Sequence, residues 1–519
     1  MLISVAIKKD LYKNLQETKI QALAITVLCL TLIVSVLGTY EYKSKYERYI
    51  TEKTANIEQL YQNKIYGTIH PKAIKAPTPL SIICKGVEQD FGNSYTFDLL
   101  TIPYFASKIY ESNSYIEGFI NLDLTVVFIW LFSIISILIA YDSVVKEREN
   151  GTLKLMFVSQ LSKTKFFFSK IISSFLSIAI IIFISILIVS IIFAVSPWIE
   201  LDKEVACAVF LFFIMTMLFV LFWISIATFL SILFKSSSQS LVASLAIWMI
   251  LLLAFPTVIK AILGDTTFIN EKKEITLLQQ DIMNDYNKKR GEIMDREIYP
   301  LIRDLQFSTY GGSPGNDQQP MWGANPPTMQ AAIKVYNTLN PMKNDIAYQK
   351  FAVANEKYLN PLQHKIQLNH RLAYFSPVSL YEQICMRIAK TSYNDQFTFF
   401  NDFKAYRDQI IEFFTKRKAF DSRLWFTPEP EYYPYSPSHS LCPKDPVKPT
   451  ELESEKLGEY YSQVRQEEKA LHLNDFPLFN ISSEANDSKD LLMGFFSFVI
   501  LSSIILLISL YKIKNYNFE

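Results

Sequence analysis

The chain lacks the Gly-Lys dipeptide that a phosphate-binding loop of the G-x-x-x-x-G-K-[ST] type requires. It has 14 glycines and none is followed by lysine, so the sequence contains no G-x-x-x-x-G-K-[ST] loop. It also contains no C-x-x-C or H-E-x-x-H motif, and its five histidines are scattered. His439 and Cys442 form H-x-x-C in a proline-rich stretch, but two candidate ligands do not make a metal site. We therefore expect a non-catalytic chain with no cofactor or metal of its own.

A strong net charge and a regular set of cysteines are missing as well. The formal net charge is +1 and no domain is strongly basic, so nothing in the sequence indicates nucleic-acid binding. Two of the five cysteines, Cys29 and Cys207, lie in apolar runs, and Cys84, Cys385 and Cys442 lie outside them. An odd number outside is not a disulfide framework, so one bridge with a free thiol and three free thiols both stay open.

Long apolar runs dominate the rest of the sequence. Half of the residues are apolar, and six runs of about 18 or more residues carry no charge, which is enough to cross about 30 Å of hydrocarbon. The runs are residues 20–40, 124–141, 171–199, 205–234, 236–259 and 491–511. The first run is too long for a signal peptide and no cleavage site follows it, so we interpret it as a retained helix. The sequence predicts an all-α polytopic membrane protein with six transmembrane helices.

Charged residues are absent from the interior of these runs. Ion-coupled carriers need such groups near the midplane, so a self-powered ion-coupled transporter is disfavoured. The third run offers only hydroxyls, at Ser173, Ser174, Ser177 and Ser185, which either pack helices or line a path. Pro256 is expected to kink the fifth run near its outer end.

Basic residues in the short loops predict the orientation. If the six spans alternate, the lysines and arginines of residues 1–19, 142–170 and 512–519 and Lys235 all fall on one side. The acidic loop Pro197–Glu204 falls on the other. The positive-inside rule then places both ends in the cytoplasm and leaves two large polar regions outside, residues 41–123 and 260–490.

The first outer region, residues 41–123, has a pattern that predicts a helix followed by a cap. Tyr46, Ile50, Ile57 and Tyr61 recur at helical spacing, so the first span should continue as a helix beyond the bilayer. Three prolines follow, at positions 71, 77 and 79, and favour a short irregular or β-containing cap.

The second outer region is expected to be mainly helical. An apolar stripe, made of Ile275, Leu278, Ile282, Tyr286 and Ile293, predicts one amphipathic helix. A Gly/Pro-rich break should follow at Ser308–Thr328, and a Pro/Tyr-rich connector at Thr427–Pro449. Further helices are predicted at Asn344–His370, around Phe399–Phe413 and after Thr450, which forms a capping-box pattern with Glu453.

The stretch KERENGTLKLMFVSQLSKTKFFFSK, from Lys146 to Lys170, stands between the second and third spans. It resembles the cytoplasmic signature of type-2 ABC transporter permeases, the ABC-2 superfamily. In that signature an acidic residue precedes E-x-E-x-GTL, and a hydroxyl-rich turn and a basic residue then lead to a lysine that opens the next span. The matching positions are Asp142, Glu147, Glu149, Gly151, Thr152, Leu153, Ser159, Ser162, Lys163 and Lys170. A proline common in that turn is absent here, with Leu161 nearby.

The resemblance extends beyond this signature. Residues 1–19 look like the interfacial amphipathic helix that precedes the first span of such permeases, and six spans are their usual number. Ala76–Gly86 and Ser376–Phe403 look like outer segments of a subfamily with large external insertions. The resemblance implies a multi-pass protein of the bacterial inner membrane that pairs with a second permease subunit, identical or related.

The resemblance also implies a role for the loop. Its coupling helix would dock in a groove of a separate ATP-binding subunit, which would hold ATP and Mg. Glu147 and Glu149 could supply charges for basic residues of that partner, and Gly151 permits a turn or a close backbone approach. The alternative is a solvated loop whose charges only set the topology.

Three functions stay open at this point. The first is an exporter permease powered by a separate ATPase, and the uncharged third to fifth spans would suit an amphipathic or lipidic cargo. The second is a mechanotransmission device, in which ATP-driven motion moves the outer helices against an envelope or periplasmic protein. The third is a membrane-anchored receptor or scaffold. A companion protein with a G-x-x-x-x-G-K-[ST] loop would eliminate the third.

Overall fold

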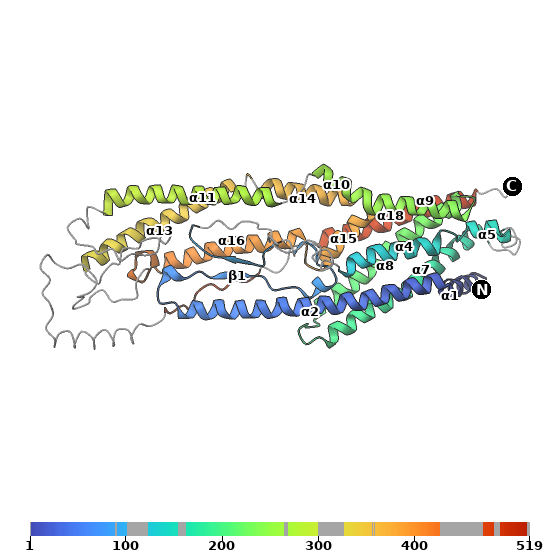
Figure 1. The fold of residues 1–519 in the computed structure, drawn as a ribbon, viewed down its shortest axis with the longest axis horizontal. Helices are drawn as coiled ribbons and strands as arrows, with labels where there is room; N and C mark the ends of the chain where they lie inside the picture. The colour runs from blue at the N-terminus through green and yellow to red at the C-terminus, as the bar shows by residue number, and fades with distance from the viewer. Residues whose placement is uncertain are drawn as a thin grey trace.

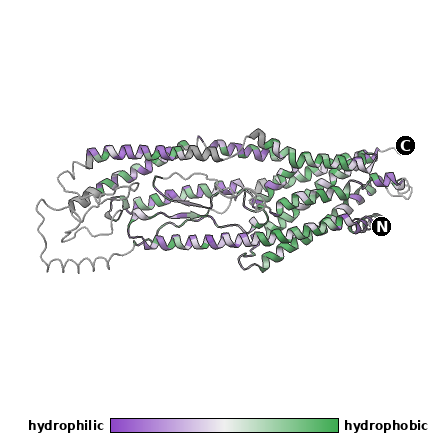
Figure 2. Ribbon diagram, viewed as in Figure 1, coloured by the Kyte–Doolittle hydropathy of each residue, from purple (hydrophilic) through white to green (hydrophobic). Residues whose placement is uncertain are grey.

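The computed structural model describes residues 2–88, 91–100, 123–153, 162–263, 268–298, 326–354, 357, 359–425, 471–481 and 488–515. The molecule is elongated and largely helical, with an apolar half and a polar half lying end to end (Figure 1, Figure 2). Several of the features predicted from the sequence fall outside the described residues. These are Ser159, Cys442, the connector Thr427–Pro449, the helix after Thr450 and most of the break Ser308–Thr328.

The described residues contain six helices that are long and apolar enough to cross a membrane. They begin with α2 (Thr18–Gln62), α4 (Leu124–Ala140), α7 (Lys163–Val195) and α8 (Lys203–Leu233), and end with α9 (Ser237–Met249) and its continuation, and α18 (Ser488–Lys514). Each overlaps one of the six predicted apolar runs, so the predicted fold class, an all-α polytopic membrane protein, is confirmed. A short amphipathic helix, α1 (Leu2–Gln16), precedes the first span and packs against α7.

The fifth span is irregular at its outer end. A π-helical turn, η3 (Ile250–Ala254), separates α9 from α10 (Phe255–Leu263). Pro256 has no N–H group to donate to the carbonyl of the preceding turn, so one bond of the regular ladder is missing where α10 begins. The π-turn lies directly before this position, and the kink expected at Pro256 stays a prediction.

Helix α8 lies at the centre of the apolar half and contacts α4, α7, α9 and α18. Its Phe219 and Trp223 are fully buried. Helix α15 (Pro377–Ile388) of the polar half also packs here: the ring of Tyr381 stacks on Phe219 with 4.5 Å between centroids. The hydroxyls of Tyr381 and Thr216 lie 2.9 Å apart, so the buried phenol has a polar partner.

The serines of the third span are packing residues. Ser173, Ser177 and Ser185 are buried and donate to carbonyls of their own helix at 2.8 to 3.0 Å. A hydroxyl satisfied in this way adds little bulk and lets a neighbouring helix approach closely. Ser177 also accepts from Asn14 Nδ2 at 3.3 Å, and this bond ties α1 to α7.

The polar half consists mainly of long helices. They are α11 (Phe268–Ile293), η4 (Met294–Ile298), α13 (Pro326–Ala354), α14 (Asn360–Ala373), α15 and α16 (Tyr393–Lys416). The stripe predicted on α11 packs as expected, since Ile282 and Tyr286 are buried against Ile346 of α13. Helix α16 buries Phe403 and Ile410 as predicted, and a capping box of Ser392 and Asp395 starts it.

The predicted helix Asn344–His370 is divided between two helices. Its first part is the end of α13, and most of the rest is α14. Lys357 and Leu359, which lie between these two helices, are π-helical. Pro361 stands in the first turn of α14, where its missing N–H does no harm.

The predicted β-containing cap lies just beyond α2. Strands β1 (Lys72–Ile74) and β2 (Ser94–Thr96) pair antiparallel, with Ala73 opposite Tyr95. Two short 3-10 helices, η1 (Tyr66–Thr68) and η2 (Pro79–Ile82), flank β1. Ala73 packs on the aromatic cluster of α16, so this small sheet covers one side of that helix.

Residues 78–87 join the two halves. Lys85 donates its backbone N–H to Asp123 Oδ2 at 3.0 Å, at the start of α4, and its ammonium to Glu41 Oε2 of α2 at 2.6 Å. Thr391, between α15 and α16, donates its hydroxyl to the Cys84 carbonyl at 3.1 Å. One loop therefore holds α2, α4 and the α15–α16 turn together.

Two of the outer cysteines belong to this joint. Cys84 and Cys385 are buried free thiols, and burial raises the pKa of each well above its ordinary value. The structure thus favours free thiols over a bridge at these two positions. Protonated thiols in such surroundings behave as small apolar groups and not as nucleophiles.

Candidate site for coupling to a partner subunit

The elbow between α4 and α7 lies at the end of the apolar half that carries both chain termini (Figure 1). It consists of residues 141–153 and the N-terminal turn of α7, with residues 154–161 outside the described part of the chain. Figure 2 shows hydrophilic residues returning here beyond the apolar helices. Most of the residues of the ABC-2-like signature gather in this elbow.

The elbow helix α5 (Val145–Glu149) is short, and its backbone is hydrogen-bonded to neighbouring helices. Val144 and Val145 are buried, and their backbone N–H groups both donate to Ser231 Oγ of α8 at 3.1 Å. The Tyr141 carbonyl accepts from Ser240 Oγ of α9 at 2.7 Å. The backbone of the elbow is therefore fixed to α8 and α9 before any charged side chain is considered.

Glu147 ties α5 to α7 and α1. Its Oε1 accepts from Lys170 Nζ at 3.0 Å, and the same ammonium lies 3.1 Å from Asp10 Oδ2 of α1. The Lys170 side chain is only 7% exposed, so this three-residue cluster is largely removed from water. Thr152 donates its hydroxyl to the other oxygen of Glu147, which leaves both carboxylate oxygens engaged within the chain.

Arg148 and Glu149, which follow Glu147, both form hydrogen bonds with the turn between α8 and α9. Arg148 donates to the carbonyls of Ile232 and Phe234, at 3.1 and 2.9 Å, where α8 ends. Glu149 accepts from the Ser237 N–H at 2.8 Å and from the Ser237 hydroxyl, where α9 begins. A cation at a helix C-terminus and a carboxylate at a helix N-terminus both match the helix dipole.

Gly151, Thr152 and Leu153 turn the chain back after α5. Gly151 has φ of +69°, a left-handed conformation that glycine adopts without strain, and it is exposed. Leu153 is buried in the core of the apolar half. At the other side of the elbow Asp142 pairs with Lys146 at 3.1 Å, one helical turn apart.

Ser162 and Lys163 start the third span. Ser162 is the N-cap of α7 and accepts from the Lys165 N–H at 3.3 Å. Lys163 donates to the Lys514 carbonyl at 3.1 Å, at the end of α18. The start of α7 is thus tied to the last span as well as to the elbow.

Most of this cluster was predicted from the sequence, but the contacts of its carboxylates within the chain were not. Both Glu147 and Glu149 accept hydrogen bonds inside the chain, and their contact with a partner stays a prediction. Asp10, Arg148, Ser231 and Ser237 were not predicted as members of the cluster. Arg148 stands inside the signature and could have been noticed, but the partners on α1, α8 and α9 are distant in sequence and carry no local signal.

A family model described as ABC-2 family transporter protein matches residues 6–415. The chain belongs to this family. The match covers α1, the elbow, five of the six candidate spans and the polar half as far as α16. This ABC-2 protein is therefore a multi-pass membrane protein and the permease component of an ABC transporter, a subunit that is generally non-catalytic. No curated protein sequence matches the chain significantly.

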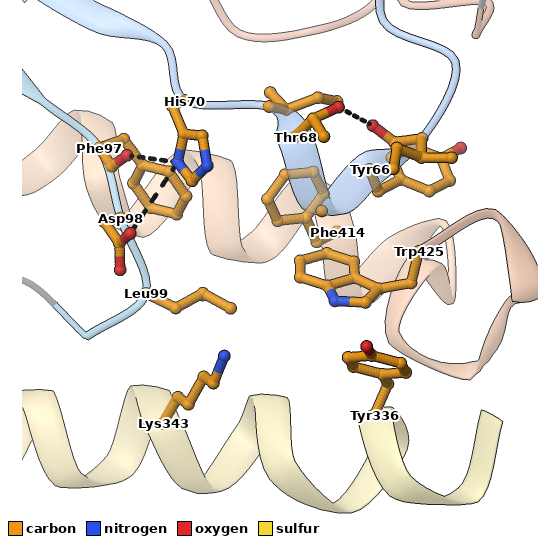
Figure 3. Close-up of a pocket in the computed structure, with 13 residues that line it drawn as sticks. Tyr66, Thr68, His70, Phe97, Asp98, Leu99, Tyr336, Lys343, Phe414 and Trp425 are labelled. Atoms are coloured by element: carbon orange, nitrogen blue, oxygen red, sulfur yellow. Dashed lines mark hydrogen bonds and ion pairs between the residues drawn. The ribbon is translucent and has the colours of Figure 1, made fainter. Parts of the chain in front are cut away.

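The polar half of this ABC-2 protein contains a cavity of about 160 Å³ (Figure 3). Tyr66, Phe414 and Trp425 form one side of it, and His70 and Asp98 lie on the other, with His70 Nδ1 4.0 Å from Asp98 Oδ2. Its volume is close to that of an engineered cavity that binds benzene, at about 150 Å³. The cavity lies where η1, α13 and the end of α16 meet.

Within the described residues, no group of three or more His, Cys, Asp or Glu side chains could hold a metal ion. His439 and Cys442 lie outside those residues.

Proposed function

We propose that the chain is the membrane subunit of an ABC exporter and receives motion at the α4–α7 elbow from a separate ATP-binding subunit. The observation that carries this proposal is the set of bonds made by Glu147, Arg148 and Glu149, which join α5 to α1, α7, α8 and α9. A displacement of α5 would have to move four other helices or break these bonds.

The exposed tip of the elbow is the surface offered to the partner. Glu149, Asn150 and Gly151 are exposed, whereas Val145 and Leu153 on either side are buried. Glu149 keeps its negative charge at this surface while Ser237 orients it, so it can still attract a basic residue of the partner. Glu147 acts inside the elbow as a link to α7.

The basic charge of three segments supports a cytoplasmic location for this end. The elbow, α1 and the end of α18 lie together (Figure 1), and they carry many of the lysines of the short loops. Basic loops stay on the cytoplasmic side of a membrane. We infer that the polar half lies outside, in the bacterial envelope, and that two such chains pair to complete the exporter.

Mechanotransmission is the second candidate, and helix α2 favours it. This helix runs without a break for 45 residues from the elbow end into the polar half. Movement of its membrane part would reach the outer domain directly. ATP hydrolysis could then rearrange the outer helices against an envelope protein without moving a cargo across the membrane.

A photo-crosslinking amino acid at Asn150 tests the docking site. Crosslinking in native membranes should capture a protein whose sequence, read by mass spectrometry, contains G-x-x-x-x-G-K-[ST]. The matched control is Leu201, which is 50% exposed in the loop at the opposite end of the spans. Capture of that ATPase from Leu201, or its absence from Asn150, would contradict the proposal.

Transport and mechanotransmission separate in reconstituted vesicles. An exporter complex should accumulate a labelled amphipathic cargo in the acceptor compartment only when ATP is hydrolysed. A mechanical device should hydrolyse ATP at the same rate, move no cargo and change the accessibility of single cysteines placed on α11.

A further inference from the structure

A groove of about 430 Å³ lies between α2 and α7, at the ends of these helices that face the polar half. Its walls are apolar and include Val36 of α2 and Ile191 and Val195 of α7. These three side chains are 52%, 52% and 76% exposed, so the groove opens on the outside of the helix bundle. Because both helices are membrane spans, the medium outside the groove is lipid.

A single cation stands among the groove's lining residues. Lys43 projects from α2, with its Nζ 4.5 Å from the centre of the Trp198 ring. Lys43 is 23 residues after Ile20, where the apolar run begins, which corresponds to about 35 Å of helix. It therefore lies just beyond about 30 Å of hydrocarbon, at the depth of the lipid headgroups. Tryptophan and lysine are the side chains that gather at this depth.

The hydroxyls of Thr39 and Ser196 in the groove are already occupied. Thr39 Oγ1 donates to the Ser35 carbonyl at 2.8 Å, and Ser196 Oγ donates to the Ile192 carbonyl at 2.7 Å. Glu47 is 3.8 Å from Lys43, a long contact between partly exposed groups that contributes little. The lysine ammonium is thus the group best able to bind an anion at the rim of the groove.

We propose that the groove binds one glycerophospholipid of the surrounding bilayer, with an acyl chain along α2 and α7 and its phosphate at Lys43. The apolar walls match the chain and the ammonium matches the phosphate. A transmembrane helix is a poorer occupant, because helices approach each other through small residues, and this groove is lined by valine and isoleucine. The bound lipid would fill the space between the outer ends of α2 and α7.

Two substitutions test the two parts of this site. Lys43→Ala removes the phosphate contact, and Val195→Trp fills the groove without disturbing the core, because Val195 is 76% exposed. The protein, purified in detergent and delipidated, is titrated with phosphatidylglycerol and followed by native mass spectrometry. Lys43→Ala should weaken the first binding event about five-fold, as expected for one lysine near a membrane surface. Val195→Trp should weaken it for charged and uncharged lipids alike.

Lys53→Ala is the matched control. Lys53 also lies on α2 beside an aromatic ring, 5.5 Å from the centre of Tyr49, but it is ten residues beyond the groove. Its removal should leave the first binding event unchanged. Equal affinities in wild type, Lys43→Ala and Val195→Trp would overturn the proposal, as would a loss in Lys53→Ala as large as in Lys43→Ala. A second copy of the chain, crosslinked through Val195 in place of lipid, would also overturn it.

Discussion

Gly86 lies directly against Thr391: a Cβ atom at Gly86 would stand 2.5 Å from the Thr391 hydroxyl oxygen. Hydrogen bonds on both sides hold the two segments together, since Val87 N–H donates to the Thr391 carbonyl at 3.1 Å and Thr391 Oγ1 donates to the Cys84 carbonyl at 3.1 Å. Gly86 also has φ of +53°, the left-handed region. The joint between the two halves therefore depends on a residue without a side chain.

Gly86→Ala should destabilise this joint. Left-handed backbone costs a non-glycine residue about 1–2 kcal/mol, and the clash with Thr391 adds to that. Thermal unfolding of the full chain in detergent should show a lower Tm. Gly92→Ala is the control, because the nearest atom to its Cβ would be 4.0 Å away. Equal Tm values for the two variants would contradict this account of the joint.

Lys170→Met should loosen the elbow. The substitution leaves the carboxylates of Asp10 and Glu147 facing each other with no cation between them, and breaking such a buried cluster costs about 3 kcal/mol. The variant should insert in the membrane but unfold at a lower temperature and retain less of its ATPase on purification. Lys165→Met, an exposed neighbour on α7, should behave like wild type. Adding Asp10→Asn to Lys170→Met should recover part of the loss.

Two substitutions at Gly151 separate the effect of side-chain size from the effect of backbone conformation. Open space surrounds its Cα, so alanine would meet no clash but would still strain the backbone at φ +69°. Asparagine tolerates this conformation better than other non-glycine residues. We expect Gly151→Ala to lower ATPase stimulation by the chain more than Gly151→Asn does. The reverse order would show that size, and not backbone conformation, matters at the tip.

Lys75 should give the polar half a pH dependence. Burial lowers the pKa of its ammonium from the ordinary 10.5, while Glu88 and Asp395 oppose that shift. Between the lowered pKa and 10.5 the unfolded chain holds more protons than the folded protein, so the stability contributed by this group rises with pH.

The measurement is the slope of Tm against pH on the alkaline side of neutrality. Lys75→Met should have a shallower rise than wild type across the same buffers. Lys72→Met, an exposed position in β1 three residues before Lys75, should keep the wild-type slope. An unchanged slope in Lys75→Met would show that other groups cause the dependence.

The sequence predicts the spans well because a membrane helix is a local signal. Charge-free runs and their flanking lysines are read directly from the chain, and so is the continuation of α2 through Tyr46 and Tyr61. The elbow was also predictable, because its signature lies in one short stretch of the sequence, from Asp142 to Lys170.

What the sequence could not supply is pairing between distant segments. Glu147 and Asp10 are linked only through Lys170, which contacts both. Gly86 contacts Thr391, although most of the sequence of the polar half separates them. Such contacts depend on how helices pack, which no local pattern encodes.

The unbroken α2 has a mechanical consequence. About 22 of its residues, some 33 Å of helix, extend past the apolar run. A tilt of about 10° at the level of the bilayer would swing the far end through roughly 6 Å, about one helical pitch. A small tilt of the membrane part of α2 would therefore act as a lever. It would move the outer end of the helix by about the size of a side chain relative to the helices outside.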